Sequence, residues 1–279
     1  MRGRHDRRTQ QFDNPYEVLE RWLETSTLAH VSDPKLKRLD LTYFLGETTH
    51  VDLPAEERLR QLAIFLEPRA SEEPFAVDRI YEAALRLEPC AWQVWESRGI
   101  TAKHVAELRS ERTEDHFRAL SLRSLFRAWA LAADGGTAYL LGKWHYEFGT
   151  LDEASAWFER ATALDPNHGF AWLYRAHCLH DQQCWRGAVV AYRKVPLSYF
   201  VGPRSFYVDI VAEAQAYCRL RAGDREGALA DFRRLIDRFE REPHRALILS
   251  LRWLDKACRG PLRDDLCGRY SDLRRVIDA

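Results

Sequence analysis

Two segments between residues 135 and 200 repeat in register at an interval of 34 residues, and this repetition constrains the fold more than any other feature of the sequence. Ala154 is followed four residues later by Phe158, and 34 residues after Ala154 comes Ala188, followed in turn by Tyr192. A small residue at the first place lets two helices approach closely, and the aromatic side chain fills the space beside it. The spacing therefore predicts a repeated pair of packed helices.

The first of these segments also carries most of a known repeat signature. The pattern W-x2-L-G-x2-Y, then A-x3-F, then P is met at Leu141, Gly142, Ala154, Phe158 and Pro166. It is missed at Ala138 and His145, which hold the places of the Trp and the Tyr. The segment resembles a tetratricopeptide repeat (TPR). Because a single helix pair of this kind cannot bury its apolar face, one repeat predicts neighbours that stack on it.

The same register is found further toward the N-terminus. Trp95 stands six residues after Pro89, as Trp172 stands six residues after Pro166. Residues 75–89 match the second helix of a repeat in the same way. Toward the C-terminus, Ala228 and Phe232 repeat the spacing of Ala188 and Tyr192. Ala228 follows Ala188 by 40 residues, which is six more than the period of 34.

The resemblance implies an all-α fold, a right-handed superhelical array of antiparallel helix pairs. We expect the array to span residues 75–243. Residues 1–13 are predicted to be a disordered basic arm, 14–74 an atypical helical region, and 244–279 a set of capping helices whose polar face closes the array.

Three features depart from the repeat. The loop 109–113 is longer than the family's turn. Pro196 and Pro203 predict a kink or a protruding insertion over 196–206. The pair Gly135-Gly136 follows a helix, and we interpret it as a helix stop.

Composition excludes several classes of protein. Formal net charge is zero, so overall charge indicates neither a nucleic-acid nor a membrane partner. No window approaches 18 consecutive apolar residues, which argues against a membrane span. Six Cys residues without an export signal are typical of reduced thiols in a cytoplasm, so we expect a cytoplasmic protein. A homo-oligomer remains open.

The sequence contains no phosphate loop, dinucleotide fingerprint, nucleophile elbow or zinc-protease motif. We therefore expect no catalytic residue, no cofactor and no metal. The densest cluster of metal-ligand types is His177, Cys178, His180, Asp181 and Cys184. His177 and His180 share one face of a helix and Cys178 turns about 100° away, so the pattern favours a helix that lines the groove and buries its Cys.

The repeat register also predicts which side chains line the concave face. In the first helix of each repeat, the signature residues pack against the partner helix. The positions i, i+4 and i+7 on the opposite side are therefore expected to face the concave surface. The partner-binding residues predicted in this way are Tyr139, Lys143, Tyr146, Leu173, His177, His180, Tyr217 and Leu220. Aromatic side chains beside Lys and His suit an extended or helical peptide with apolar anchors and some acid. In an alternative arrangement the helices of 15–66 cover part of this face.

By resemblance, the chain is a scaffold or adaptor that holds a protein or peptide, and it is no enzyme. The alternative is a helical enzyme or enzyme subunit, with a pocket built by 92–134 and the insertion 196–208. A third interpretation is a peptide-responsive regulator that uses the arm 1–13 on nucleic acid.

A second family was also weighed. Trp95 to Arg98 and Trp172 to Arg175, each preceded by a Pro, look like the Trp-x-x-Arg helices of protein prenyltransferase alpha subunits. The Asn that opens that motif is missing before Trp95, and the matching segments are too few.

Overall fold

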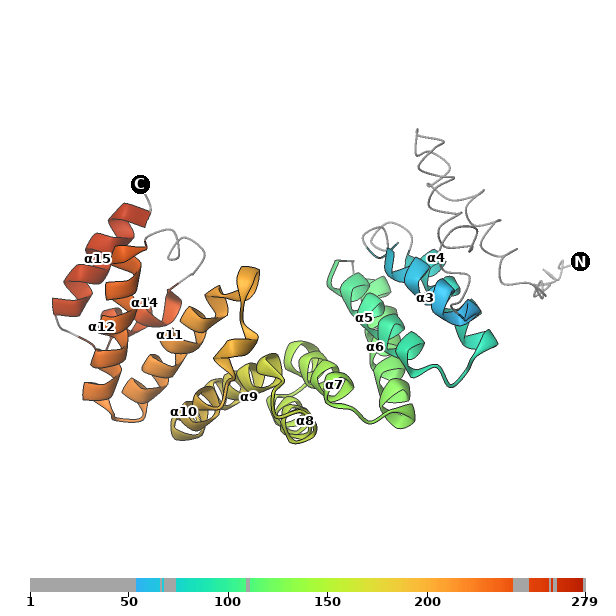
Figure 1. The fold of residues 1–279 in the computed structure, drawn as a ribbon, viewed down its shortest axis with the longest axis horizontal. Helices are drawn as coiled ribbons and strands as arrows, with labels where there is room; N and C mark the ends of the chain where they lie inside the picture. The colour runs from blue at the N-terminus through green and yellow to red at the C-terminus, as the bar shows by residue number, and fades with distance from the viewer. Residues whose placement is uncertain are drawn as a thin grey trace, which may run out of the picture. The chain divides into compact units, whose positions relative to one another are not determined.

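The computed structural model describes residues 54–65, 67, 74–108, 111–242, 251–260, 262 and 265–277. Every regular element in these residues is a helix (Figure 1), so the predicted all-α class is confirmed. The predicted arm 1–13 and the predicted helices before residue 54 lie outside the described residues. The chain divides into two compact units, Met1–Ala133 and Asp134–Ala279.

The first unit contains four described helices that pack as two pairs. They are α3 (Ala55–Phe65), α4 (Pro74–Leu87), α5 (Trp92–Leu108) and α6 (Glu111–Leu131). Helix α3 packs on α4, and α5 packs on α6. The predicted long loop 109–113 is wrong, because its last three residues form the first turn of α6. The core of this unit includes the buried rings of Tyr81 and Phe117.

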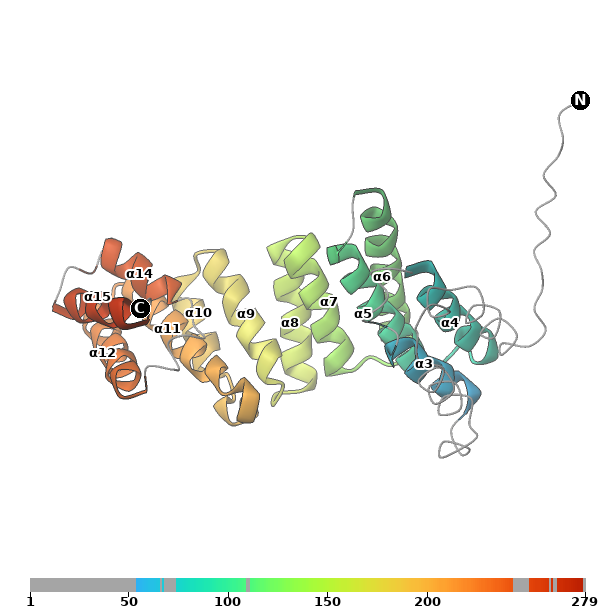
Figure 2. The ribbon, with the colours of Figure 1, turned by 90° about the horizontal axis from the view of Figure 1, so that it is seen from above.

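The second unit contains three helix pairs and two further helices. The pairs are α7 (Gly135–Phe148) with α8 (Leu151–Leu164), α9 (Gly169–Asp181) with α10 (Trp185–Arg193), and α11 (Phe206–Arg221) with α12 (Arg225–Arg241). Figure 2 shows the pairs following one another in chain order. Both helices of the second pair begin 34 residues after their counterparts, at 169 against 135 and at 185 against 151. The predicted period is therefore present in the structure.

Aromatic side chains at the predicted places form the centre of each pair. Phe158, Tyr192 and Phe232 are 0%, 2% and 0% exposed. Each stands four residues after an alanine that is itself fully buried. Small and large side chains thus alternate across the helix crossings, as close packing requires.

The beginning of α7 corrects one prediction. Gly135 and Gly136 form the first turn of α7 and not the stop of the preceding helix, which ends at Leu131. Asp134 caps α7, because its carboxylate accepts a hydrogen bond of 2.8 Å from the backbone N–H of Thr137. A Cβ atom on Gly135 would lie 2.8 Å from the Cβ of Asp165, so the chain after α8 packs directly on this turn.

The predicted insertion is confirmed as two short 3-10 turns between α10 and α11, η3 (Leu197–Tyr199) and η4 (Gly202–Arg204). Gly202 adopts a positive φ of 57°, which glycine tolerates without strain. This insertion accounts for the six residues by which the third pair exceeds the period.

The two Trp-x-x-Arg segments form the same set of contacts in the two units. Nε1 of Trp95 donates to the carbonyl of Pro89 at 3.0 Å, and Nε1 of Trp172 donates to that of Pro166 at 2.9 Å. Each Arg three residues later pairs with a glutamate 16 residues before it, Arg98 with Glu82 and Arg175 with Glu159. These contacts tie the first helix of a pair to the helix before it.

The last two helices complete the second unit. Helix α14 (Arg252–Arg259) packs on α11, and α15 (Asp265–Ile277) packs on α12. The helix predicted over 243–258 is described only from residue 252. Leu251, just before α14, adopts a left-handed φ of 44°. The buried side chains of these helices, such as Leu254 and Leu266, close the apolar face of the third pair.

Candidate functional site

Side chains from α7 form one edge of an aromatic surface in the second unit. Tyr139, Lys143 and Tyr146 are spaced at i, i+4 and i+7 and are all half-buried. The ring of Tyr139 lies 4.7 Å from the ring of His168 and 6.0 Å from that of Tyr174, centroid to centroid. Three of the predicted residues therefore lie together and remain accessible.

Helix α9 contributes the other edge. The Nζ atom of Lys143 lies 5.1 Å from the ring centroid of Tyr174, within the range of a cation–π contact. The hydroxyl of Tyr146 donates a hydrogen bond of 2.6 Å to the carboxylate of Asp181. Nδ1 of His177 lies 2.7 Å from the hydroxyl of Tyr192. We name this set the α7–α9 surface, which comprises Tyr139, Lys143, Tyr146, Tyr174, His177 and Asp181.

Burial and the neighbouring polar groups together set the protonation of this surface. It lowers the pKa of His177 to about 4, so this imidazole is neutral at pH 7. Burial also works against the charge of Lys143, but the neighbouring Tyr174 hydroxyl and the Glu147 carboxylate outweigh it and raise the pKa of Lys143. Asp181 has a lowered pKa despite its partial burial, because His180 and Tyr146 hydrogen-bond to its carboxylate. At neutral pH the surface therefore carries one ammonium and one carboxylate.

Three of the predicted partner-binding residues do not line an accessible surface, which corrects the prediction of their exposure. Leu173, His180 and Tyr217 are 1%, 5% and 1% exposed. Leu173 packs in the core between α9 and α11, while His180 and Tyr217 lie against the ring of Trp253, with centroids 4.1 Å and 5.1 Å away. Leu220 is half-buried beside the core of the C-terminal helices.

Trp253, which covers His180 and Tyr217, comes from α14. The carboxylate of Glu213 on α11 accepts hydrogen bonds of 2.9 Å from the backbone N–H groups of both Trp253 and Leu254. These bonds hold the first turn of α14 against His180 on α9 and Tyr217 on α11, which were predicted to line the concave face. Trp253 belongs to the predicted capping segment, but sequence spacing carried no signal of the surface on which it packs.

Two residues of the α7–α9 surface were missed as partner-binding residues. Tyr174 was not among the predicted partner-binding residues. Asp181 was considered only as a member of the cluster of metal-ligand residue types. Their signal is the helical spacing of Phe170, Tyr174, His177 and Asp181, which are half-buried or exposed at i, i+4, i+7 and i+11 of α9.

The metal-like cluster is dispersed by the helix. Cys178 is fully buried beside Ala154 and Phe158, whereas His177 contacts Tyr192. Among the described residues, no group of three or more His, Cys, Asp or Glu side chains is placed to hold a metal ion.

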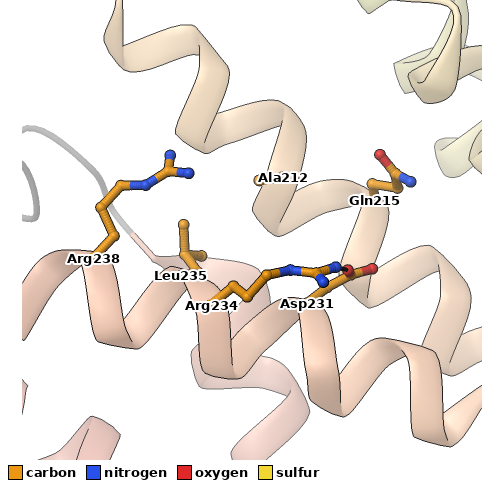
Figure 3. Close-up of a pocket in the computed structure, with 6 residues that line it drawn as sticks. All are labelled: Ala212, Gln215, Asp231, Arg234, Leu235 and Arg238. Carbon is orange, nitrogen blue, oxygen red and sulfur yellow. Dashed lines mark hydrogen bonds and ion pairs between the residues drawn. The ribbon is translucent and has the colours of Figure 1, made fainter.

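A pocket of about 250 Å³ lies between α11 and α12 (Figure 3). It is lined by Ala212, Gln215, Asp231, Arg234, Leu235 and Arg238. Both arginines are already paired, Arg234 with Asp231 and Arg238 with the buried Asp209. The pocket includes no residue of the segments 92–134 and 196–208, from which the alternative enzyme site was predicted.

No helix within the described ranges is both long and apolar enough to cross a bilayer. No protein-family model matches the sequence. No curated protein sequence matches it either.

Solved structures do match the fold. MamA is 15% identical with a TM-score of 0.52, and the match covers 67% of this chain and 96% of MamA. The pilF protein of Pseudomonas aeruginosa is 15% identical with a TM-score of 0.54, covering 81% of this chain and 94% of pilF. YrrB, described as a TPR protein with an unusual peptide-binding site, is 17% identical with a TM-score of 0.48, covering 64% and 84%. The repeated helix pairs, their 34-residue period and the similarity in fold to MamA and pilF together identify the chain as a TPR-like protein by its fold.

Proposed function

We propose that the second unit holds a peptide segment of another protein on the α7–α9 surface, so that the chain acts as a scaffold or adaptor. The observation that carries this proposal is the group of half-buried tyrosines, Tyr139, Tyr146 and Tyr174, around Lys143. Tyrosine offers a large apolar ring and a polar tip at little cost in side-chain entropy, and it is enriched at protein interfaces.

The charged groups of this surface can exchange partners. Lys143 pairs with Glu147 at 3.1 Å, and both side chains are about a quarter exposed, 27% and 26%. An ion pair that water reaches contributes little stability, so a carboxylate of a partner could replace Glu147 at small cost. The surface therefore suits a peptide with apolar anchors and some acid, extended or helical.

The test is affinity capture from the native cell with three baits, the unaltered chain, Lys143→Glu with Tyr174→Ala, and Arg186→Glu. Arg186 is exposed on α10 and does not belong to the α7–α9 surface, and its substitution makes the same change of charge as Lys143→Glu. We expect proteins that the unaltered chain and the Arg186→Glu bait capture alike and that the double variant loses. Far-UV circular dichroism of the three proteins should be identical.

Capture that survives in the double variant, or that is lost equally with Arg186→Glu, would show that the α7–α9 surface is not the binding site. Purified captured protein should then bind the chain in isolation, with the same dependence on Lys143 and Tyr174.

A further inference from the structure

One face of α9 runs between two elements that lie outside the repeated helix pairs. Phe170, Tyr174, His177 and Asp181 follow one another along this face and span about 16 Å at the helical rise. The insertion meets the beginning of α9, and α14 meets its end. The two ends of the face differ in chemistry.

The end next to the insertion is aromatic and apolar. The ring of Tyr199 in η3 stacks on His168 with centroids 6.0 Å apart and meets Phe170 edge-on at 5.7 Å. A Cβ atom on Gly169 would lie 2.5 Å from the Tyr199 ring, so the insertion packs directly on the first turn of α9. Tyr199 is 36% exposed, and its neighbours Leu197 and Val201 are 45% and 68% exposed. The insertion thus exposes three apolar side chains within five residues, and exposed apolar surface of this kind is typical of contact sites.

The end next to α14 is cationic. The guanidinium of Arg252 lies 4.1 Å from the ring centroid of Trp253, and the ammonium of Lys256 lies 5.4 Å from it. That ring in turn contacts His180 on α9. Both cations are exposed, and within the described part of the chain neither forms an ion pair with a carboxylate.

The charge of Arg252 is also felt on the α9 face itself. Burial is the largest cause of the lowered pKa of His177, and the positive charge of Arg252 is a smaller cause that acts in the same direction. The carboxylates nearby are engaged, since Asp181 accepts from Tyr146 and Glu147 pairs with Lys143. An incoming carboxylate therefore meets, at the α14 end, two exposed cations that are not held in an ion pair within the described residues.

We propose that the partner peptide lies along α9 in a fixed orientation. A large apolar or aromatic side chain of the peptide packs against the insertion, and its acidic side chains lie beside Arg252 and Lys256. This inference rests on the proposed function and adds the composition and the orientation of the peptide. An extended chain covers about 16 Å with about five residues, which sets the distance between the apolar anchor and the acid. Because the cations are exposed, their attraction weakens as salt screens it.

Selection from a random-peptide display library on the full chain tests this inference. We expect enriched peptides in which an aromatic or large aliphatic residue is separated by three to six positions from Asp or Glu. With Arg252→Glu and Lys256→Glu, the acidic preference should disappear while the apolar anchor persists. With Tyr199→Ala, the apolar preference should weaken while the acidic one persists.

The matched control is Arg186→Glu with Arg193→Glu, which changes the charge equally on exposed places of α10 and should leave the selection unchanged. A synthetic copy of the most enriched peptide should bind the Arg252→Glu, Lys256→Glu variant at least tenfold more weakly than it binds the unaltered chain. At high salt this difference in affinity should be smaller.

Three results would overturn the inference. They are a selection that enriches no peptide, enrichment without acidic residues, and an acidic preference that survives the α14 substitutions. Peptides that depend on Lys143 and Tyr174 but show no acidic preference would remove only this inference and leave the proposed function intact.

Discussion

Gly142 on α7 lies so close to Phe158 on α8 that a Cβ atom at position 142 would be 2.7 Å from two carbons of the phenyl ring. The ring is fully buried and also lies 5.7 Å from the ring of Tyr174 on α9. It therefore cannot move aside without disturbing the next helix pair. The signature residues Gly and Phe are thus two parts of one contact.

Replacing Gly142 with alanine should destabilise the protein, even though alanine is the better helix former. Overpacking a core of this kind costs about 1–3 kcal/mol. The matched control is Gly268→Ala on α15, where an added Cβ meets nothing within 4 Å. That change should be neutral or stabilising by up to about 1 kcal/mol. Urea unfolding of both variants measures the difference, and equal stabilities would disprove the tight crossing.

The helix pairs could be predicted from the sequence because their cause is local. Small and aromatic residues at a fixed spacing determine how two neighbouring helices cross, as Ala188 and Tyr192 show. The ends of helices were predicted less well. Asp134 caps α7, but a glycine pair after an acidic residue is equally compatible with a helix stop, and only the neighbouring helix decides between them.

The two Trp-x-x-Arg contacts should differ in their contribution to stability. The side chains of Arg98 and Asp78 are 10% and 14% exposed and share a hydrogen bond of 2.7 Å. Arg175 and its partner Glu159 are 25% and 67% exposed. Removing one partner of a buried pair leaves a buried charge, so Arg98→Ala should cost about 3 kcal/mol. Arg175→Ala should cost less than about 1 kcal/mol, because water replaces its partner.

Chemical unfolding followed by circular dichroism separates the two variants. Asp78→Asn is the companion of Arg98→Ala, and the double variant should be less destabilised than the sum of the single ones. Equal effects of Arg98→Ala and Arg175→Ala would show that burial does not distinguish the two contacts.

The accessible surface was harder to predict than the helices. Spacing within one helix places Tyr139, Lys143 and Tyr146 on a common face, and the structure keeps them accessible. The same rule places His180 and Tyr217 on the corresponding faces of later helices, where Trp253 covers them. This contact joins residues more than thirty positions apart, so no local pattern encodes it.

Tyr217→Ala should therefore affect folding more than partner binding. The side chain is 1% exposed and packs against Trp253. Truncating a fully buried aromatic side chain costs about 3–5 kcal/mol. Tyr146→Ala, at a half-buried position of the α7–α9 surface, should cost less. Melting temperatures of the two variants measure this contrast, and a larger loss for Tyr146→Ala would contradict the burial described here.

Glu213 makes the attachment of α14 sensitive to pH. Its side chain is 4% exposed, and burial raises its pKa from about 4.5 to about 7, although the N–H groups of Leu254 and Trp253 and the charge of Arg252 favour the ionised form. The folded protein thus binds a proton at Glu213 more tightly than the unfolded chain does. The resulting stabilisation is fully present below about pH 4.5 and is lost as the pH rises through about 7.

The free energy of unfolding should therefore fall between pH 5 and pH 7.5 through Glu213, by up to about 3 kcal/mol. His177 acts in the opposite direction in part of this range, because its lowered pKa makes the folded state bind protons less tightly than the unfolded chain. The comparison with Glu213→Gln removes the contribution of His177, since glutamine keeps an oxygen for the α14 N–H groups and does not titrate. Urea unfolding at a series of pH values should give a difference between the two proteins that grows in favour of Glu213→Gln above pH 5. A difference that stays constant with pH would mean that Glu213 does not carry the shift.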